Sequence, residues 1–174
     1  MGICAVFAAI LCICSPVAIP IGPIPITLSV FAVMLCAVVL PWQYATGAIL
    51  VYLVLGLFLP VFSGGNTGLA AFPGPTGGYI WSYLLMVPVI RSVISLPLRG
   101  KLSAYLLAFA GCTASLLVCY ACGTLQFSLL TGRSFGESVA VCVIPFIGFD
   151  LLKAAAAAAL GVCLRNLLRR MRLL

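Results

Sequence analysis

The sequence predicts an all-α integral membrane protein, a compact bundle of six transmembrane helices in a single domain over residues 1–174. Of the 174 residues, 65% are hydrophobic and only 6% are charged, whereas a soluble domain has roughly 25% charged residues. The first charged residue is Arg91, so about half the chain precedes any Asp, Glu, Lys or Arg. A membrane helix and its connector need roughly 25 to 30 residues, which leaves room for about six helices.

Six apolar segments are the expected helices, because proline, glycine and the few charged residues bound them. In chain order they are residues 2–19, 27–41, 44–61, 78–96, 102–124 and 138–164. The connector at 19–25 is the proline-rich turn IPIGPIP, and the one at 96–101, LPLRGK, is short and basic.

The connector at residues 63–78 differs from the others, because its sixteen residues, SGGNTGLAAFPGPTGG, are mostly small, polar or proline. Irregular backbone near membrane depth is tolerated only where it is buried in protein or lines a cavity. We therefore expect this connector to help close a binding site. An ordinary extracellular loop is the alternative.

The basic residues predict the orientation of the chain in a cell membrane. Seven of the nine lie in the fourth connector, at its edge or in the C-terminal tail, namely Arg91, Arg99, Lys101, Arg165, Arg169, Arg170 and Arg172. Only Arg133 lies in a connector on the other side. The positive-inside rule then places both termini in the cytoplasm. Lipid headgroups account for the net charge of +7, so nucleic acid is not expected as a partner.

Asp150 and Lys153 interrupt the last apolar segment. If that segment were one helix from Val139 to Leu164, Asp150 would lie roughly 17 to 21 Å from either end, at mid-bilayer. A charge at that depth costs about 2.5 to 3.5 kcal/mol, so it indicates a functional site. The i,i+3 spacing puts both side chains on one face, where they suit a solute with hydrogen-bond donors and a negative group. Mutual neutralisation without any ligand is the structural alternative.

Catalysis is not expected from this composition. The chain has no histidine and only two carboxylates, so it offers neither an acid–base pair nor a metal cluster. It also lacks a phosphate-binding Walker A sequence, so it cannot hydrolyse ATP itself. The nine cysteines lie within or beside apolar segments and behave as small hydrophobic residues, and Cys119 and Cys122 have no second pair to complete a metal site.

Small residues predict close helix contacts. Ala5 and Ala9 are four residues apart on the first helix, and the run of alanines at 154–159 followed by Gly161 gives the last helix a smooth surface. For the last helix we expect packing within the bundle. For the first helix, packing in the bundle and docking to another membrane protein both remain open.

Three stretches of the chain carry a resemblance to a known family, namely IPIGPIPITLSVFAVMLCAVVLP (19–41), LVLGLFLPVFSGGNTGLAAFPGPTGGYIW (53–81) and FDLLKAAAAAAL (149–160). In this order and spacing they resemble the BioY family, the biotin-specific substrate-binding (S) components of energy-coupling-factor (ECF) transporters. The GPTGGY sequence at 74–79, together with the DxxK pair at Asp150 and Lys153, carries most of the resemblance.

The resemblance implies six transmembrane helices around an outward-facing biotin site under the first, third and fifth connectors. Asp150 and Lys153 would contact biotin, the transported ligand, and no cofactor is implied. The third connector with Asn66, Gly77, Gly78 and Tyr79 would help close the site. One polar contact would differ, because the family commonly has glutamine at the position of Ser29.

The resemblance also implies partners, namely a transmembrane coupling protein and two cytoplasmic ATPases. Ala5 and Ala9 match the small-residue pattern with which the family docks on the coupling protein. Two other functions remain open on the residues alone. The chain could be a solitary secondary carrier of a small vitamin-like carboxylate, proton-coupled through Asp150, or a membrane assembly factor that binds no ligand.

Overall fold

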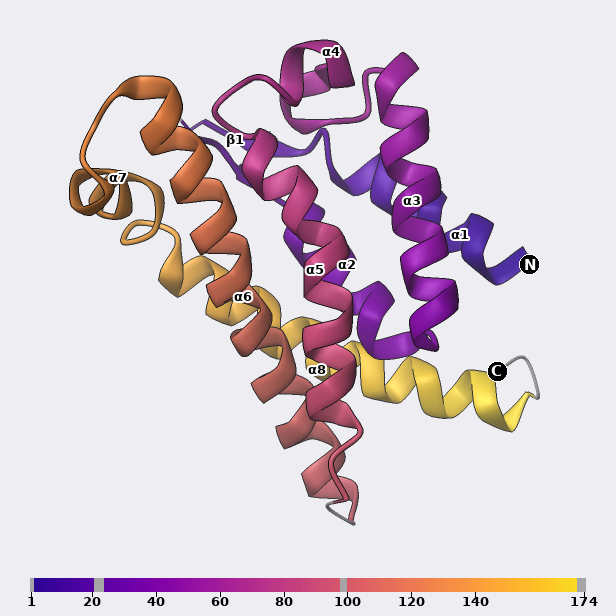
Figure 1. Ribbon diagram of the computed structural model, residues 1–174. Coiled ribbons are helices and arrows are strands. Elements are labelled where there is room, and N and C mark those ends of the chain that lie inside the picture. The colour runs from indigo at the N-terminus through magenta and orange to yellow at the C-terminus, as the bar shows by residue number, and fades with distance from the viewer. Residues whose placement is uncertain (1, 21–23, 98–99, 172–174) are drawn as a thin grey trace.

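The computed structural model describes residues 2–20, 24–97 and 100–171, and it folds them into a mostly helical bundle (Figure 1). The longer helices are α1 (Gly2–Cys14), α2 (Ser29–Val39), α3 (Trp42–Phe58), α5 (Gly77–Ile94), α6 (Lys101–Thr131) and α8 (Ile147–Arg170). Short elements connect them: strands β1 (Ala18–Ile19) and β2 (Ile26–Thr27), the 3-10 turn η1 (Ser63–Gly65), and helices α4 (Gly68–Ala71) and α7 (Phe135–Cys142). The expected basic residues Arg99 and Arg172 lie outside the described residues.

Four helical segments of the described chain are long and apolar enough to cross a membrane, Trp42–Gly65, Gly77–Ile94, Lys101–Thr131 and Ile147–Arg170. Helices α1 and α2 are shorter, with 13 and 11 residues. At about 1.5 Å per residue they span about 20 and 16 Å, less than the roughly 30 Å of hydrocarbon in a bilayer. The expected boundaries 2–19 and 27–41 are therefore too wide.

Proline explains where these two helices end. The backbone N–H of Ser15 still bonds to the carbonyl of Leu11, but Pro16 follows, and the residue before a proline is disfavoured in a helix. The chain then turns into β1, which pairs antiparallel with β2. Pro41 likewise follows Leu40, the C-cap residue of α2. The predicted proline-rich turn is thus framed by a small β-hairpin.

The last predicted segment, 138–164, is wrong as a single helix. Helix α7 ends at Cys142 and α8 begins at Ile147, with turn residues between them. Pro145 lies in this break, and proline has no N–H for a helical hydrogen bond. Asp150 therefore lies in the first turn of α8 and not in the middle of a long helix. The fifth predicted segment, 102–124, is too short, because α6 continues to Thr131. The helix ends at Gly132, whose left-handed φ of 67° caps it.

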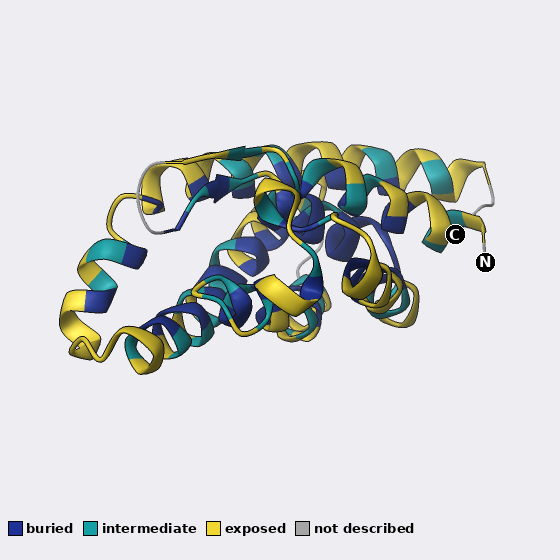
Figure 2. Cartoon of the chain, turned by 90° about the horizontal axis from the view of Figure 1, so that it is seen from above, coloured by how far each residue is buried: buried dark blue, intermediate teal, exposed yellow. Residues whose placement is uncertain are grey.

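The core of the bundle surrounds α2. Most residues of this helix are buried, and Figure 2 shows the buried residues gathered between the surrounding helices. Helix α8 packs on α2 through its small residues, as the alanine run predicts. Ala154, Ala157 and Ala158 are buried, and a Cβ added to Gly161 would lie 2.6 Å from a methyl group of Val38.

Helices α5 and α6 pack closely along much of their length. At the end of the bundle drawn uppermost in Figure 1, the β-hairpin and α4 lie beside the first turns of α5. The first turns of α5 therefore lie against these connectors. The first half of α8 contributes Asp150 and Lys153 to a cavity beside these connectors.

Candidate functional site

A cavity lies under the β-hairpin, between the first halves of α5 and α8 and the middle of α6. Its free volume is about 50 Å³, below the roughly 300 to 1,000 Å³ of small-molecule sites, so the walls of the cavity lie close together in this structure. Its walls are largely apolar, including Ile24, Ile26, Val30, Ile80 and Phe146. Polar groups project among them from Ser15, Thr27, Ser29, Ser63, Thr76, Tyr79, Tyr83, Tyr120, Asp150 and Lys153.

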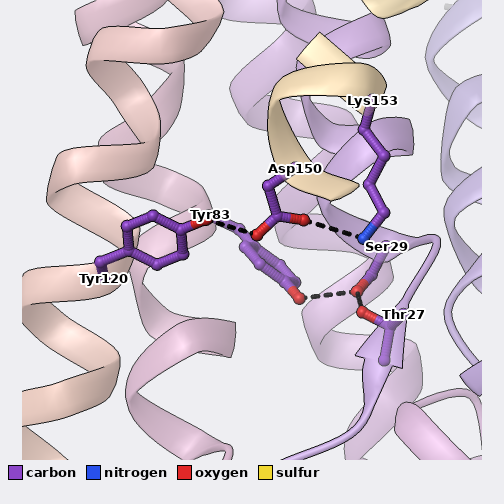
Figure 3. Close-up of polar contacts among 6 residues, drawn as sticks. All are labelled: Thr27, Ser29, Tyr83, Tyr120, Asp150 and Lys153. Carbon is purple, nitrogen blue, oxygen red and sulfur yellow. Dashed lines mark hydrogen bonds and ion pairs between the residues drawn. The ribbon is translucent and has the colours of Figure 1, made fainter. Parts of the chain in front are cut away.

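Asp150 is the centre of the charged part of the cavity (Figure 3). The ammonium of Lys153 donates to its Oδ1 at 2.9 Å, and the hydroxyl of Tyr120 donates to its Oδ2 at 2.7 Å. The side chains of Asp150 and Lys153 are only 8% and 13% exposed. The predicted pair on one face of the helix is thus present, and α6 contributes a third member that the spacing alone did not reveal.

The first turn of α8 is a favourable place for Asp150. Unpaired backbone N–H groups give a helix N-terminus a partial positive charge, which stabilises a carboxylate. The prediction that Asp150 lies in the middle of a long helix is therefore wrong. Because each carboxylate oxygen accepts more than one hydrogen bond and an ammonium donates three, both groups retain capacity for a ligand.

A chain of hydroxyl groups forms a second polar wall (Figure 3). The Oγ1 of Thr27 lies 2.5 Å from the Oγ of Ser29, which in turn lies 2.7 Å from the Oη of Tyr83. Ser29 is buried and lines the cavity, as predicted, but its short side chain is tied to its neighbours. These hydrogen-bonded hydroxyl groups link the β-hairpin to α5.

Tyr79 lines the cavity as expected. Its hydroxyl donates to the carbonyl of Cys142 at 3.1 Å, joining α5 to the end of α7. Gly123 on α6 leaves room for the ring, since a Cβ there would lie 2.2 Å from the ring carbon Cζ. Tyr79 is therefore fixed at the side of the cavity between these helices.

Gly77 and Gly78 do not line the cavity. They let α5 approach its neighbours: a Cβ on Gly78 would lie 2.4 Å from the carbonyl oxygen of Cys122, and one on Gly77 would lie 2.0 Å from that of Phe72. The amide of Gln126 fastens the same connector by donating to the carbonyls of Phe72 and Gly74 at 2.7 and 2.8 Å. Steric room, and not ligand contact, explains both glycines in this structure.

Asn66 is exposed and lies outside the main cavity. Its side-chain amide donates to the carbonyl of Ser63 at 2.9 Å. It lines a second, more open hollow between the β-hairpin and the 63–76 connector. Because Pro25, Ser63 and Thr76 border both spaces, Asn66 lies at the outer approach to the cavity.

Sequence reasoning missed several polar residues of the site, namely Ser15, Thr27, Ser63, Thr76, Tyr83 and Tyr120. The Oγ of Ser63 is buried and has no hydrogen-bond partner among the described residues, so it is available to a ligand. Tyr79 and Tyr83 are four residues apart and so share a helix face, a signal that could have identified Tyr83. Tyr120 has no such local signal.

Ala5 and Ala9 lie far from this polar cluster on the outer face of α1. Both are exposed, whereas Phe7, Ala8 and Leu11 turn inward. Neither alanine lines the cavity. No group of three or more His, Cys, Asp or Glu side chains gathers to form a metal site within residues 2–20, 24–97 and 100–171.

Comparison with known proteins places this architecture in a family. The chain is 34% identical to "Biotin transporter BioY2" of Lactococcus lactis subsp. cremoris, over 92% of this chain and 86% of that protein. It is also 34% identical to "Biotin transporter BioY" of Thermotoga maritima, over 93% of each chain. The solved S-component for biotin from an ECF-type ABC transporter superposes with a TM-score of 0.82 at 26% identity, covering 95% of this chain and 89% of that one. The residue pattern that defines the BioY family matches residues 1–170, and the chain belongs to the BioY family.

Proposed function

We propose that this chain is the membrane-embedded biotin-binding subunit, the S component, of an ECF-type ABC transporter, and that it takes part in uptake and not in catalysis. Its family membership and its likeness to a biotin S-component support this. The observation that carries the proposal is the Tyr120–Asp150–Lys153 cluster at the wall of an otherwise apolar cavity.

The chemistry of biotin fits these walls. Its ureido group carries two N–H donors and a carbonyl acceptor, and its side chain ends in a carboxylate. Asp150 accepts N–H donors, and Lys153 attracts a carboxylate as a point charge. The apolar residues would cover the thiophane ring and alkyl chain. Ser29, Tyr79 and the free hydroxyl of Ser63 would supply further contacts, and Asn66 would meet the ligand at the mouth.

The proposal includes the arrangement in the membrane. The whole chain would form one domain in the cell membrane, with α1, α2, α3, α5, α6 and α8 as its six membrane helices. Helices α1 and α2 are short but apolar. The β-hairpin and the turn at Pro41 would have to cover the remaining thickness of the bilayer beside them. The excess of basic residues would keep both termini in the cytoplasm and the cavity facing outward.

The proposal also includes the energising partners. The chain would work with a transmembrane coupling protein and two cytoplasmic ATPases, since it has no nucleotide-binding sequence of its own. The exposed alanines of α1 would dock on the coupling protein, because small residues allow close helix approach in lipid.

Uptake of radiolabelled biotin by cells that lack their own biotin transporter tests this function. Cells that express the chain with an ECF coupling module should accumulate biotin in a way that stops when ATP is depleted. Accumulation that survives ATP depletion but stops when the proton gradient collapses would instead identify a solitary secondary carrier.

A further inference from the structure

Three arginines lie near the ends of α5 and α8 that are remote from the cavity. Arg91 lies in the last turn of α5, while Arg165 and Arg169 are four residues apart and so share one face of α8. Helices α5 and α8 thus each bring basic side chains to the ends at which they finish. Arg165 is fifteen positions beyond Asp150, about 22 Å along the helix, so this cluster is separate from the cavity.

Arg165 is the unusual member of the cluster. It is only 8% exposed, and its Nε has no hydrogen-bond partner among the described residues. Arginine stays protonated in proteins, so it cannot avoid the cost of burial by losing its charge. A buried guanidinium N–H without a hydrogen-bond partner is unfavourable, and neighbouring cations add to the cost.

The carboxylate side chains of the protein do not neutralise this charge. The chain has two, and both are engaged elsewhere. Asp150 binds Lys153 and Tyr120 at the cavity, and Glu137 caps the first turn of α7 through Ser134. An external anion would supply a partner for the Nε of Arg165.

We propose that Arg91, Arg165 and Arg169 bind the phosphate of an anionic phospholipid headgroup. Both α5 and α8 are long and apolar enough to cross a bilayer, and these arginines lie near their last turns, at the level where headgroups begin. Basic pockets between membrane helices bind such headgroups, and the planar guanidinium donates two parallel hydrogen bonds to a phosphate.

Binding of short-chain phosphatidylglycerol to the purified full-length chain, followed by native mass spectrometry, tests the proposal. Arg165→Gln and Arg169→Gln should each weaken phosphatidylglycerol binding at least fivefold, and short-chain phosphatidylcholine should bind weakly to every variant. Arg170→Gln is the matched control. It removes the same charge one residue away, but residue 170 faces another side of the helix and is exposed, so binding should change less than twofold.

Two further measurements distinguish loss of the lipid site from loss of charge or of folding. Arg165→Lys keeps the charge without the guanidinium fork and should bind phosphatidylglycerol with intermediate strength. Biotin binding by each variant should match wild type, which shows that the bundle is folded and separates failure of the lipid site from failure of the proposed function.

Equal loss of phosphatidylglycerol binding in Arg170→Gln would overturn the proposal, since net charge alone would then explain it. Equal binding of phosphatidylcholine, or displacement of phosphatidylglycerol by inorganic phosphate at matched concentration, would also overturn it. So would wild-type lipid binding by Arg165→Gln combined with lost assembly on the ECF module, because the arginines would then meet a partner's carboxylate.

Discussion

Tyr120 donates its hydroxyl hydrogen to the Oδ2 of Asp150 at 2.7 Å, bridging α6 and α8 across the cavity. Lys153 holds the other carboxylate oxygen at 2.9 Å. The carboxylate is thus fixed from two sides by groups on different helices. A ligand that enters the cavity meets an acceptor whose direction is already set, which lowers the ordering cost of binding.

Asp150→Asn and Lys153→Ala should each weaken biotin binding at least tenfold, about 1.4 kcal/mol, in isothermal titration calorimetry. Truncating one member of a buried charge pair leaves the other unpaired, which typically costs about 2 to 5 kcal/mol. Glu137→Gln and Lys101→Ala, which alter exposed groups, are the matched controls and should bind as wild type. Normal binding by both cavity variants would mean that the pair serves only the structure.

Tyr120→Phe should weaken biotin binding by roughly fivefold or more, because it removes a hydrogen bond to a charged group, typically about 1.5 to 3 kcal/mol. Tyr105→Phe is the control, since Tyr105 is on the same helix but 39% exposed. Calorimetric titration with biotin compares the affinities of the two variants. If the two bind equally well, Tyr120 does not orient Asp150 for the ligand.

Tryptophan at Ala5 and Ala9 should leave biotin binding intact but abolish uptake driven by the ECF module. Both alanines are exposed on α1 and remote from the cavity, so bulk there would hold a docking partner away. Ala159→Trp, at an exposed position of α8, should reduce uptake much less. Parallel loss of binding and uptake in the Ala5 and Ala9 variant would show that these alanines pack the bundle instead.

Gly78→Ala should lower the free energy of unfolding of the ligand-free protein by about 1 to 3 kcal/mol, the usual cost of overpacking, and so lower its melting temperature. The new methyl group would lie 2.4 Å from the carbonyl oxygen of Cys122, a backbone atom that cannot easily move. Gly47→Ala is the control, since nothing lies within 4 Å of its added Cβ. A melting temperature for Gly78→Ala at or above that of Gly47→Ala would contradict the close α5–α6 contact.

The sequence alone was sufficient for the helical membrane class and for part of the site. Apolar segments and scarce charges predicted the helices, and the i,i+3 spacing predicted that Asp150 and Lys153 share a face. Tyr79, which the family resemblance implied for the site, lines the cavity. These features depend on local composition and spacing, which a sequence displays directly.

The remaining features depend on contacts between distant segments. Tyr120 is thirty residues from Asp150 in the chain, so their hydrogen bond becomes visible only when α6 and α8 are packed. The resemblance placed Gly78 at the ligand site, but in the structure it lies against the carbonyl of Cys122 on α6, a contact that the sequence does not display. The break at Pro145 was missed because apolar residues on both sides preserve the appearance of one long helix.

Calorimetric titration of the purified chain with biotin is the most direct test of the central claim. We expect saturable binding at one site per chain, and at a biotin concentration 100 times Kd a gain in folding stability of about 2.7 kcal/mol. Valerate, which has the carboxylate but neither ring of biotin, should bind far more weakly. Absence of binding heat together with an unchanged melting curve at millimolar biotin would contradict the account.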